Sequence, residues 1–214
     1  MTEYAVDLRR IGGAFGVDDN ARRLIHYRFA EDVCMKAGAS WAPTCPTIKI
    51  KWALAEYAYD DSIHSYWIGQ RLPDLRVLEG ADLSQPPTLR TSSKMEPPNE
   101  QFLKFVEEMQ YQGDELLRVV GLYRVLKTHL AVNYRYHRDV TDPVCDQPTV
   151  RTLDHILLEE EKHLRWGQAA YEELANTPER RREANEWQAH IEDLLIRAGG
   201  ITGDDWDGWK SNGA

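Results

Sequence analysis

Residues 153–167 read Leu-Asp-His-Ile-Leu-Leu-Glu-Glu-Glu-Lys-His-Leu-Arg-Trp-Gly. The apolar residues of this stretch recur at helical spacings of three, four and seven, which predicts an α-helix with one face in a core. Glu160 and His163 fall on that inward face, one turn apart, so a carboxylate and an imidazole can point at a single atom. The inward face otherwise consists of Leu153, Ile156, Leu157, Leu164 and Gly167.

The position of Glu160 on this face predicts a metal site. Burying a bare carboxylate among leucines is costly unless the group is neutralised or binds a cation. We therefore interpret Glu160 and His163 as ligands of a divalent metal, with a buried ion pair or a solvated stripe as the alternative. The neighbouring Glu159 and Glu161 are expected to turn outward.

Two further segments place ionisable residues on an apolar helical face. In the segment 48–71, Asp61 and His64 lie within the stripe marked by Ile50, Leu54, Tyr57 and Ile68. Asp60 is the alternative inward residue there. Glu31 lies on the apolar face of an earlier helix, among Leu24, Tyr27, Cys34 and Met35. Its alternative role is a salt bridge to Arg22, Arg23 or Arg28.

The pattern over the whole chain predicts an all-α four-helix bundle with one long crossover and an extra C-terminal helix. Residues 72–98 carry five prolines and little periodicity, which is typical of a crossover. We expect one helical domain over residues 1–198 and a flexible tail over 199–214 that holds Trp206 and Trp209. The helices are expected at about 19–38, 48–71, 99–138 (broken near Gly113), 148–176 and 178–198.

With these motifs the chain resembles the ferritin-like superfamily, in particular its dimetal-carboxylate (di-iron) oxidases and oxygenases. Such proteins place one Glu on each of two bundle helices and Glu-x-x-His on each of the other two. The resemblance covers about residues 19–176. It implies a metal centre of two iron ions, with a single ion or manganese as alternatives. The matching residues are Glu31, then Asp61 with His64, where Asp replaces Glu, and finally Glu160 with His163.

The chain departs from the family pattern on the third helix. The residue level with Glu160 should lie near position 126, but residues 119–130 contain no carboxylate. Glu115 is about eleven residues away, roughly 16 Å along a helix. Tyr123 or His129 could instead supply an unusual ligand or act near the metal as a catalytic residue, and each also reads as an ordinary core or hydrogen-bonding residue. His137 is read as a surface or cap residue.

Charge and composition exclude several classes of protein. The chain has 26 Lys and Arg against 35 Asp and Glu, a formal net charge of −9, and no basic block. Binding to nucleic acid or to an anionic membrane surface is therefore not expected. No apolar run approaches the ~20 residues of a membrane span, and the N-terminus has no secretory h-region. Three widely spaced cysteines indicate a reducing, cytoplasmic location.

These observations lead to three hypotheses about function. The first is a non-haem iron oxidase or oxygenase that acts on a small organic substrate with O2 and draws on an electron donor. The second is a non-enzymatic ferritin-like module that binds metal or serves a structural role. The third is a helical hydrolase or isomerase that uses Glu160 and His163 as a metal-free acid–base pair. The oligomeric state is left open, with a homodimer as one alternative.

Overall fold

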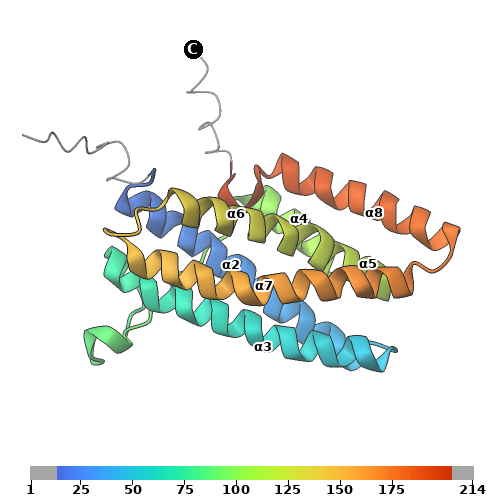
Figure 1. Cartoon of the computed structure of the whole chain (residues 1–214), viewed down its shortest axis with the longest axis horizontal. Coiled ribbons are helices and arrows are strands. Elements are labelled where there is room, and N and C mark those ends of the chain that lie inside the picture. Colours follow the sequence, from blue (N-terminus) through green and yellow to red (C-terminus); the bar gives the residue numbers. More distant parts are fainter. Residues whose placement is uncertain (1–13, 204–214) are drawn as a thin grey trace, which may run out of the picture.

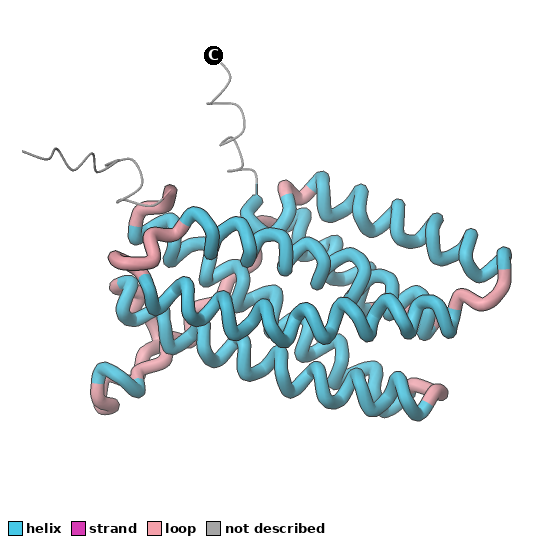
Figure 2. The backbone as a smooth tube through the Cα atoms, in the orientation of Figure 1, coloured by secondary structure: helices cyan, strands magenta, loops and turns pink. Residues whose placement is uncertain are grey.

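The computed structural model of the chain describes residues 14–203, and these form an all-α bundle in which no strand occurs (Figures 1 and 2). The predicted fold class is confirmed at this level. Short 3-10 turns at Ala42–Thr44, Leu72–Leu75 and Pro87–Leu89 lie between the longer helices. The α-helices are α2 (Val17–Trp41), α3 (Ile48–Arg71), α4 (Glu100–Gln110), α5 (Glu115–Val119), α6 (Lys127–Val140), α7 (Gln147–Leu174) and α8 (Pro178–Arg197).

Most helix starts follow the capping chemistry of the sequence. The Asp146 side chain accepts a hydrogen bond from the Thr149 amide, and Pro148 lies in the first turn of α7. Helix α2 is different, because it begins at Val17 and its N-cap, Gly16, offers no side chain. Asp18 and Asp19 lie inside the first turn instead, where carboxylates favour the positive end of the helix dipole.

The helices run in two directions along the bundle (Figure 1). Helices α2 and α7 run one way, and α3 and the segment from α5 to α6 run the other way. The chain therefore has to return along the bundle between α3 and α5. It does so through the irregular residues 76–99 and through α4.

Helix α4 corrects the prediction of one broken helix over 99–138. The chain breaks near Gly113 as expected, but it then reverses direction, so α4 packs beside the following segment. A Cβ atom at Gly121 would lie 3.0 Å from Cγ of Met109. In one continuous helix, twelve residues would separate these two positions by roughly 18 Å, so their close approach requires the chain to reverse between them.

A π-helix, η4 (Val120–Leu126), joins α5 to α6 without interrupting the helical path. A π-helical turn holds more residues than an α-helical turn, so it changes which residues face the core after it, and such turns are frequent at functional sites. The residue that directly follows η4 is Lys127.

The C-terminal end of the described chain packs against the bundle. Residues 200–203 form a 3-10 turn, and Ile201 within it is buried. Residues 204–214, which include Trp206 and Trp209 and most of the predicted tail, lie outside the described residues. Between residues 14 and 203, no helix combines the length and apolar character needed to span a membrane.

Candidate metal centre

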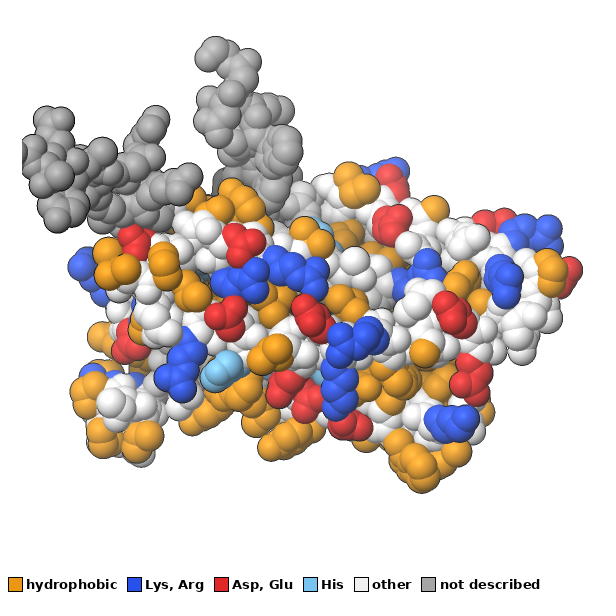
Figure 3. All heavy atoms as spheres, in the orientation of Figure 1, with side chains coloured by type: hydrophobic (Ala, Val, Ile, Leu, Met, Phe, Trp, Pro, Cys, Tyr) orange, Lys and Arg blue, Asp and Glu red, His pale blue; other side chains and the backbone are white. Residues whose placement is uncertain are grey.

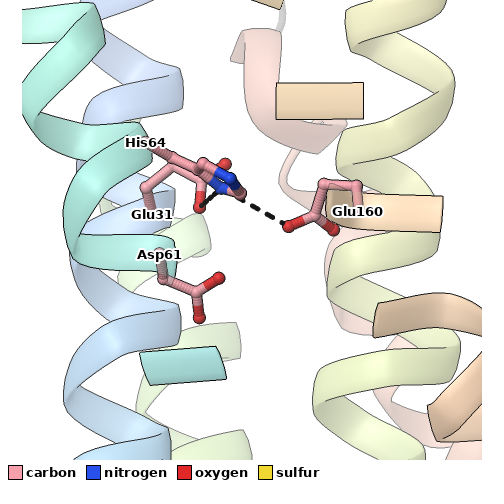
Figure 4. A group of neighbouring side chains, drawn as sticks. All are labelled: Glu31, Asp61, His64 and Glu160. Atoms are coloured by element: carbon pink, nitrogen blue, oxygen red, sulfur yellow. Dashed lines mark hydrogen bonds and ion pairs between the residues drawn. The ribbon is translucent and has the colours of Figure 1, made fainter. Parts of the chain in front are cut away.

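The five predicted ligands are buried in the middle of the bundle, each at most 1% exposed. Figure 4 shows four of them, with Glu31 from α2, Asp61 and His64 from α3, and Glu160 from α7 directed toward a common point. One ligand atom from each of these four residues lies within 4.8 Å of the others, so the group could hold a metal ion. His163 lies beside the group, with Nδ1 3.2 Å from Oε1 of Glu160.

His64 offers one nitrogen to the group and uses the other outside it. Its Nδ1 is 3.3 Å from Oε2 of Glu31 and 3.7 Å from Oε1 of Glu160. Its Nε2 is 2.7 Å from Oε2 of Glu159, to which it donates a hydrogen bond. Burial lowers the pKa of His64, but the charge of Glu31 and the bond to Glu159 raise it to about 10. Without a metal the ring is therefore an imidazolium, and a metal would take the place of the inner proton.

His163 has the same arrangement on the other side. Its Nε2 is 3.1 Å from Oδ2 of Asp60, and its Nδ1 faces the interior. A carboxylate behind each imidazole is typical of metal sites, since it fixes the tautomer and the ring orientation. Sequence reasoning missed the roles of Asp60 and Glu159. The signal that could have found them is their position, one residue before an inner carboxylate and therefore at the edge of the same face.

The third-helix residue that faces the ligands is Lys127, one position from the predicted level of 126. Its Nζ lies 2.7 Å from Oδ1 of Asp61 and 2.5 Å from Oε1 of Glu160. Nδ1 of His163 is 3.1 Å from the same ammonium and can accept its third hydrogen bond. Burial lowers the pKa of Lys127, but Asp61 and Glu160 raise it well above its usual value, so the side chain stays charged.

The two carboxylates that bond to Lys127 have pKa values shifted in opposite directions. Burial raises the pKa of Asp61 to about 7 despite the adjacent ammonium. Burial acts in the same direction on Glu160, but there the positive charge of Lys127 and the adjacent His163 prevail and lower the pKa to about 2. Glu160 is thus the firmly ionised acid of the centre.

Glu31 pairs with groups of the centre rather than with an arginine. Oε1 of Glu31 accepts a 2.5 Å hydrogen bond from the Tyr134 hydroxyl, and Oε2 faces His64. The guanidinium of Arg28, one of the predicted alternative partners, donates to the carbonyl oxygens of Ser92 and Lys94.

One oxygen of the centre has no partner. Oε2 of Glu160 is buried, and no donor within residues 14–203 reaches it. Leaving a buried charged oxygen unsatisfied is costly. A metal ion bound to Glu160 would satisfy this atom, so the residues present fit a bound cation.

The structure does not bring His129 to this centre. Its Nε2 accepts a 2.9 Å hydrogen bond from the Ile201 amide, which ties α6 to the C-terminal turn. His129 lies two positions after Lys127, so their side chains point to nearly opposite sides of the helix. His137, read from the sequence as a surface or cap residue, is fully buried and bonds to Asn20.

Tyr123 lies near the centre, where burial and the charge of Asp61 raise its pKa well above the usual value, and Glu115 has its partners elsewhere. The Tyr123 ring packs edge-on against Trp166 with 4.9 Å between centroids, and its Cβ closely approaches Gly167. Glu115 accepts a 2.9 Å hydrogen bond from the Thr47 hydroxyl at the start of α3. Its predicted distance from the centre agrees with this location.

Carboxylates and imidazoles together suit iron, manganese or zinc better than calcium or magnesium. Comparison of the chain with protein-family models, with curated proteins and with solved structures gave no match. The geometry of the centre is therefore the basis for any functional assignment.

Proposed function

We propose that this protein is a non-haem iron oxidase or oxygenase that uses O2 on a small organic substrate. The observation that carries the proposal is the buried convergence of Glu31, Asp61, His64 and Glu160, with one oxygen of Glu160 lacking a partner. Ligands of this type suit iron, and manganese is the alternative. When bound, iron would supply the one-electron and O2 chemistry that protein side chains lack.

The path of the chain supports a ferritin-like topology as part of this proposal. The first and fourth long helices, α2 and α7, run in one direction, and α3 and the α5–α6 segment run in the other. A long connection between the second and third bundle helices is the feature that separates such folds from simple up-and-down bundles.

The residues around the ligands have separable roles in this proposal. Glu159 and Asp60 would orient the rings of His64 and His163 through their outer nitrogens. Tyr57 lies over the His163 ring, with 4.2 Å between centroids, and helps to exclude water from the centre. Lys127 would hold a proton and a positive charge at Nζ beside two of the carboxylates.

Anaerobic loading with ferrous iron followed by exposure to O2 tests the proposal. We expect the protein to retain iron through gel filtration and then to consume O2 with a change in absorbance. An oxygen electrode measures the O2 consumption, and stopped-flow spectroscopy measures the absorbance change. Glu160→Gln, which keeps the side-chain shape, should lose both. Glu161→Gln, a change at the exposed neighbour, should retain both. A folded wild-type protein that binds no iron, or bound iron that leaves O2 untouched, contradicts the proposal.

Lys127 also favours a second candidate, a structural module that works without metal. Its ammonium already bonds to Asp61, Glu160 and His163. Thermal unfolding with a chelator and with added iron separates the candidates. A ligand that binds only the folded state raises the melting temperature as its concentration rises. Identical melting curves under both conditions would favour the structural module.

A further inference from the structure

The ammonium of Lys127 has three hydrogen atoms and three acceptors within hydrogen-bonding distance. They are Oδ1 of Asp61, Oε1 of Glu160 and Nδ1 of His163, at 2.7, 2.5 and 3.1 Å. All three are atom types that ligate metals, and all belong to predicted ligands. Lys127 is fully buried, so it satisfies these atoms without help from solvent.

Other ligand atoms of the centre make no bond to Lys127. They include Oε2 of Glu31, Nδ1 of His64 and the unpartnered Oε2 of Glu160. The four residues able to share one ion are Glu31, Asp61, His64 and Glu160, and His163 is outside that set. Asp61 and Glu160 therefore belong both to the partners of Lys127 and to the set that could hold one ion, whereas Glu31 and His64 belong to the second set alone.

We propose that Lys127 permanently occupies the second cation position, so that the centre binds one divalent ion and not two. This inference rests on the metal-binding part of the proposed function, and it does not depend on iron or on O2.

Charge balance points to the same number. The three buried carboxylates of Glu31, Asp61 and Glu160 are neutralised by one ammonium together with one divalent ion, with both histidines neutral. A second divalent ion beside Lys127 would leave excess positive charge in a dry interior, which is strongly unfavourable. Without any metal, the ammonium of Lys127 and the imidazolium of His64 balance only two of the three carboxylates.

Metal stoichiometry tests the inference without any activity. The full-length protein is stripped with a chelator, titrated anaerobically with Mn²⁺, passed through gel filtration and analysed by mass spectrometry for metal and protein. Electron paramagnetic resonance then reports whether the bound Mn²⁺ ions are isolated or magnetically coupled. We expect one isolated ion per chain for the wild-type protein.

Two substitutions at Lys127 should change that number. Lys127→Glu replaces the ammonium with a carboxylate ligand, and Lys127→Met removes the charge and frees its acceptors. We expect each to bind a second ion, with a coupled Mn²⁺ spectrum. Lys162→Met is the matched control, because Lys162 pairs with Glu56 at the surface and its loss should leave one ion. Refolding in the presence of Mn²⁺, checked by circular dichroism, identifies variants that fold only with metal.

The outcomes separate this inference from the proposed function. Two coupled ions in the wild-type protein, or one ion in both folded Lys127 variants, would overturn the single-ion inference while metal binding stands. No ion in the folded wild-type protein would remove the proposed function and the inference together.

Discussion

At the scale of single residues, Lys127 is the group on which the centre depends. A fully buried lysine is rare and is stable only when its charge is paired. Here the pairing is reciprocal, since Asp61 and Glu160 also need a positive charge at that position. Removing one partner of a buried ion pair leaves the other charge uncompensated, and this costs more than the intact pair contributes.

Lys127→Met should therefore destabilise the metal-free protein, by about 3–5 kcal/mol in the free energy of unfolding. Guanidinium denaturation in the presence of a chelator measures the loss. Lys162→Met should change the free energy of unfolding by less than about 1 kcal/mol, because exposed ion pairs contribute little. Equal denaturation midpoints for Lys127→Met and the wild-type protein would show that Asp61 and Glu160 do not need the ammonium.

The residues of the centre were predictable to different degrees. Glu31, Asp61, His64, Glu160 and His163 interrupt apolar helical faces, so their burial could be read from spacing. Lys127 could not be read in this way. A long cationic side chain at the right level is normally assigned to the surface, and nothing local shows that two acids on other helices neutralise it.

At the scale of elements, the π-helix η4 is held against α7 by a glycine. A Cβ atom at Gly167 would lie 2.4 Å from Cβ of Tyr123, which is rigidly attached to its backbone. Tyr123 precedes Lys127 by four residues on the same helical path, so this contact also positions the segment that carries the ammonium.

Gly167→Ala should thus lower the free energy of unfolding by about 1–3 kcal/mol, the usual effect of overpacking a core. This exceeds the gain of up to about 1 kcal/mol that alanine brings to a helix interior. Gly113→Ala is the control, since a Cβ atom there meets nothing within 4 Å. Urea unfolding curves of the two variants provide the comparison, and a Gly167→Ala variant as stable as Gly113→Ala would contradict the close contact.

The elements themselves were predictable where periodicity is strong and where capping residues mark their ends. The reversal at residues 111–114 was not, because Gly113 shows that the helix can break but does not give the direction of the chain afterwards. That direction is set by tertiary packing, in which Met109 lies against Gly121. The π-helical register of η4 likewise leaves no signature in a single sequence.

At the scale of the whole molecule, buried neutral histidines predict sensitivity to acid. Burial, with the charge of Arg23, lowers the pKa of His137 to about 3, and burial lowers that of His129 to about 4. The unfolded chain binds these protons near pH 6.5. The stability that the two residues contribute is therefore complete above pH 6.5 and is lost as the pH falls toward 4.

By pH 5 each of these histidines should reduce the free energy of unfolding by about 2 kcal/mol relative to neutral pH. Denaturant unfolding at a series of pH values measures the slope. His137→Asn should flatten it, while His155→Asn, a change at an exposed histidine, should leave it unchanged. An unaltered slope in the His137→Asn protein would mean that the acid response comes from elsewhere.

The outer face of α3 predicts self-association. Ile48, Trp52, Tyr59 and Tyr66 are 47–66% exposed, and hydrophobic side chains gather along this edge in Figure 3. At 100° per residue the four lie within about 40° of one another. Trp52 and Tyr66 each lie seven residues from Tyr59. In two antiparallel copies of α3 related by a two-fold axis at Tyr59, Trp52 of one copy would therefore lie opposite Tyr66 of the other.

We expect a dimer at micromolar concentration that Tyr59→Lys converts to monomer, measured by sedimentation velocity. Tyr111→Lys is the control, since Tyr111 is even more exposed but lies outside this row. If the wild-type protein sediments as a monomer at all concentrations, this row of side chains does not pair two copies of the chain.

The covalent attachment of Lys127 has a consequence for the life of the protein in a cell. A tethered ammonium cannot be diluted away or captured by a competing chelator, so part of the counter-charge is present as soon as the polypeptide is synthesised. The buried carboxylates can therefore pack around the ammonium as the chain folds, before any metal ion binds. In the proposed single-ion centre, acquisition and exchange of the ion would then be separate from folding, and scarcity of the metal would leave the protein folded but inactive.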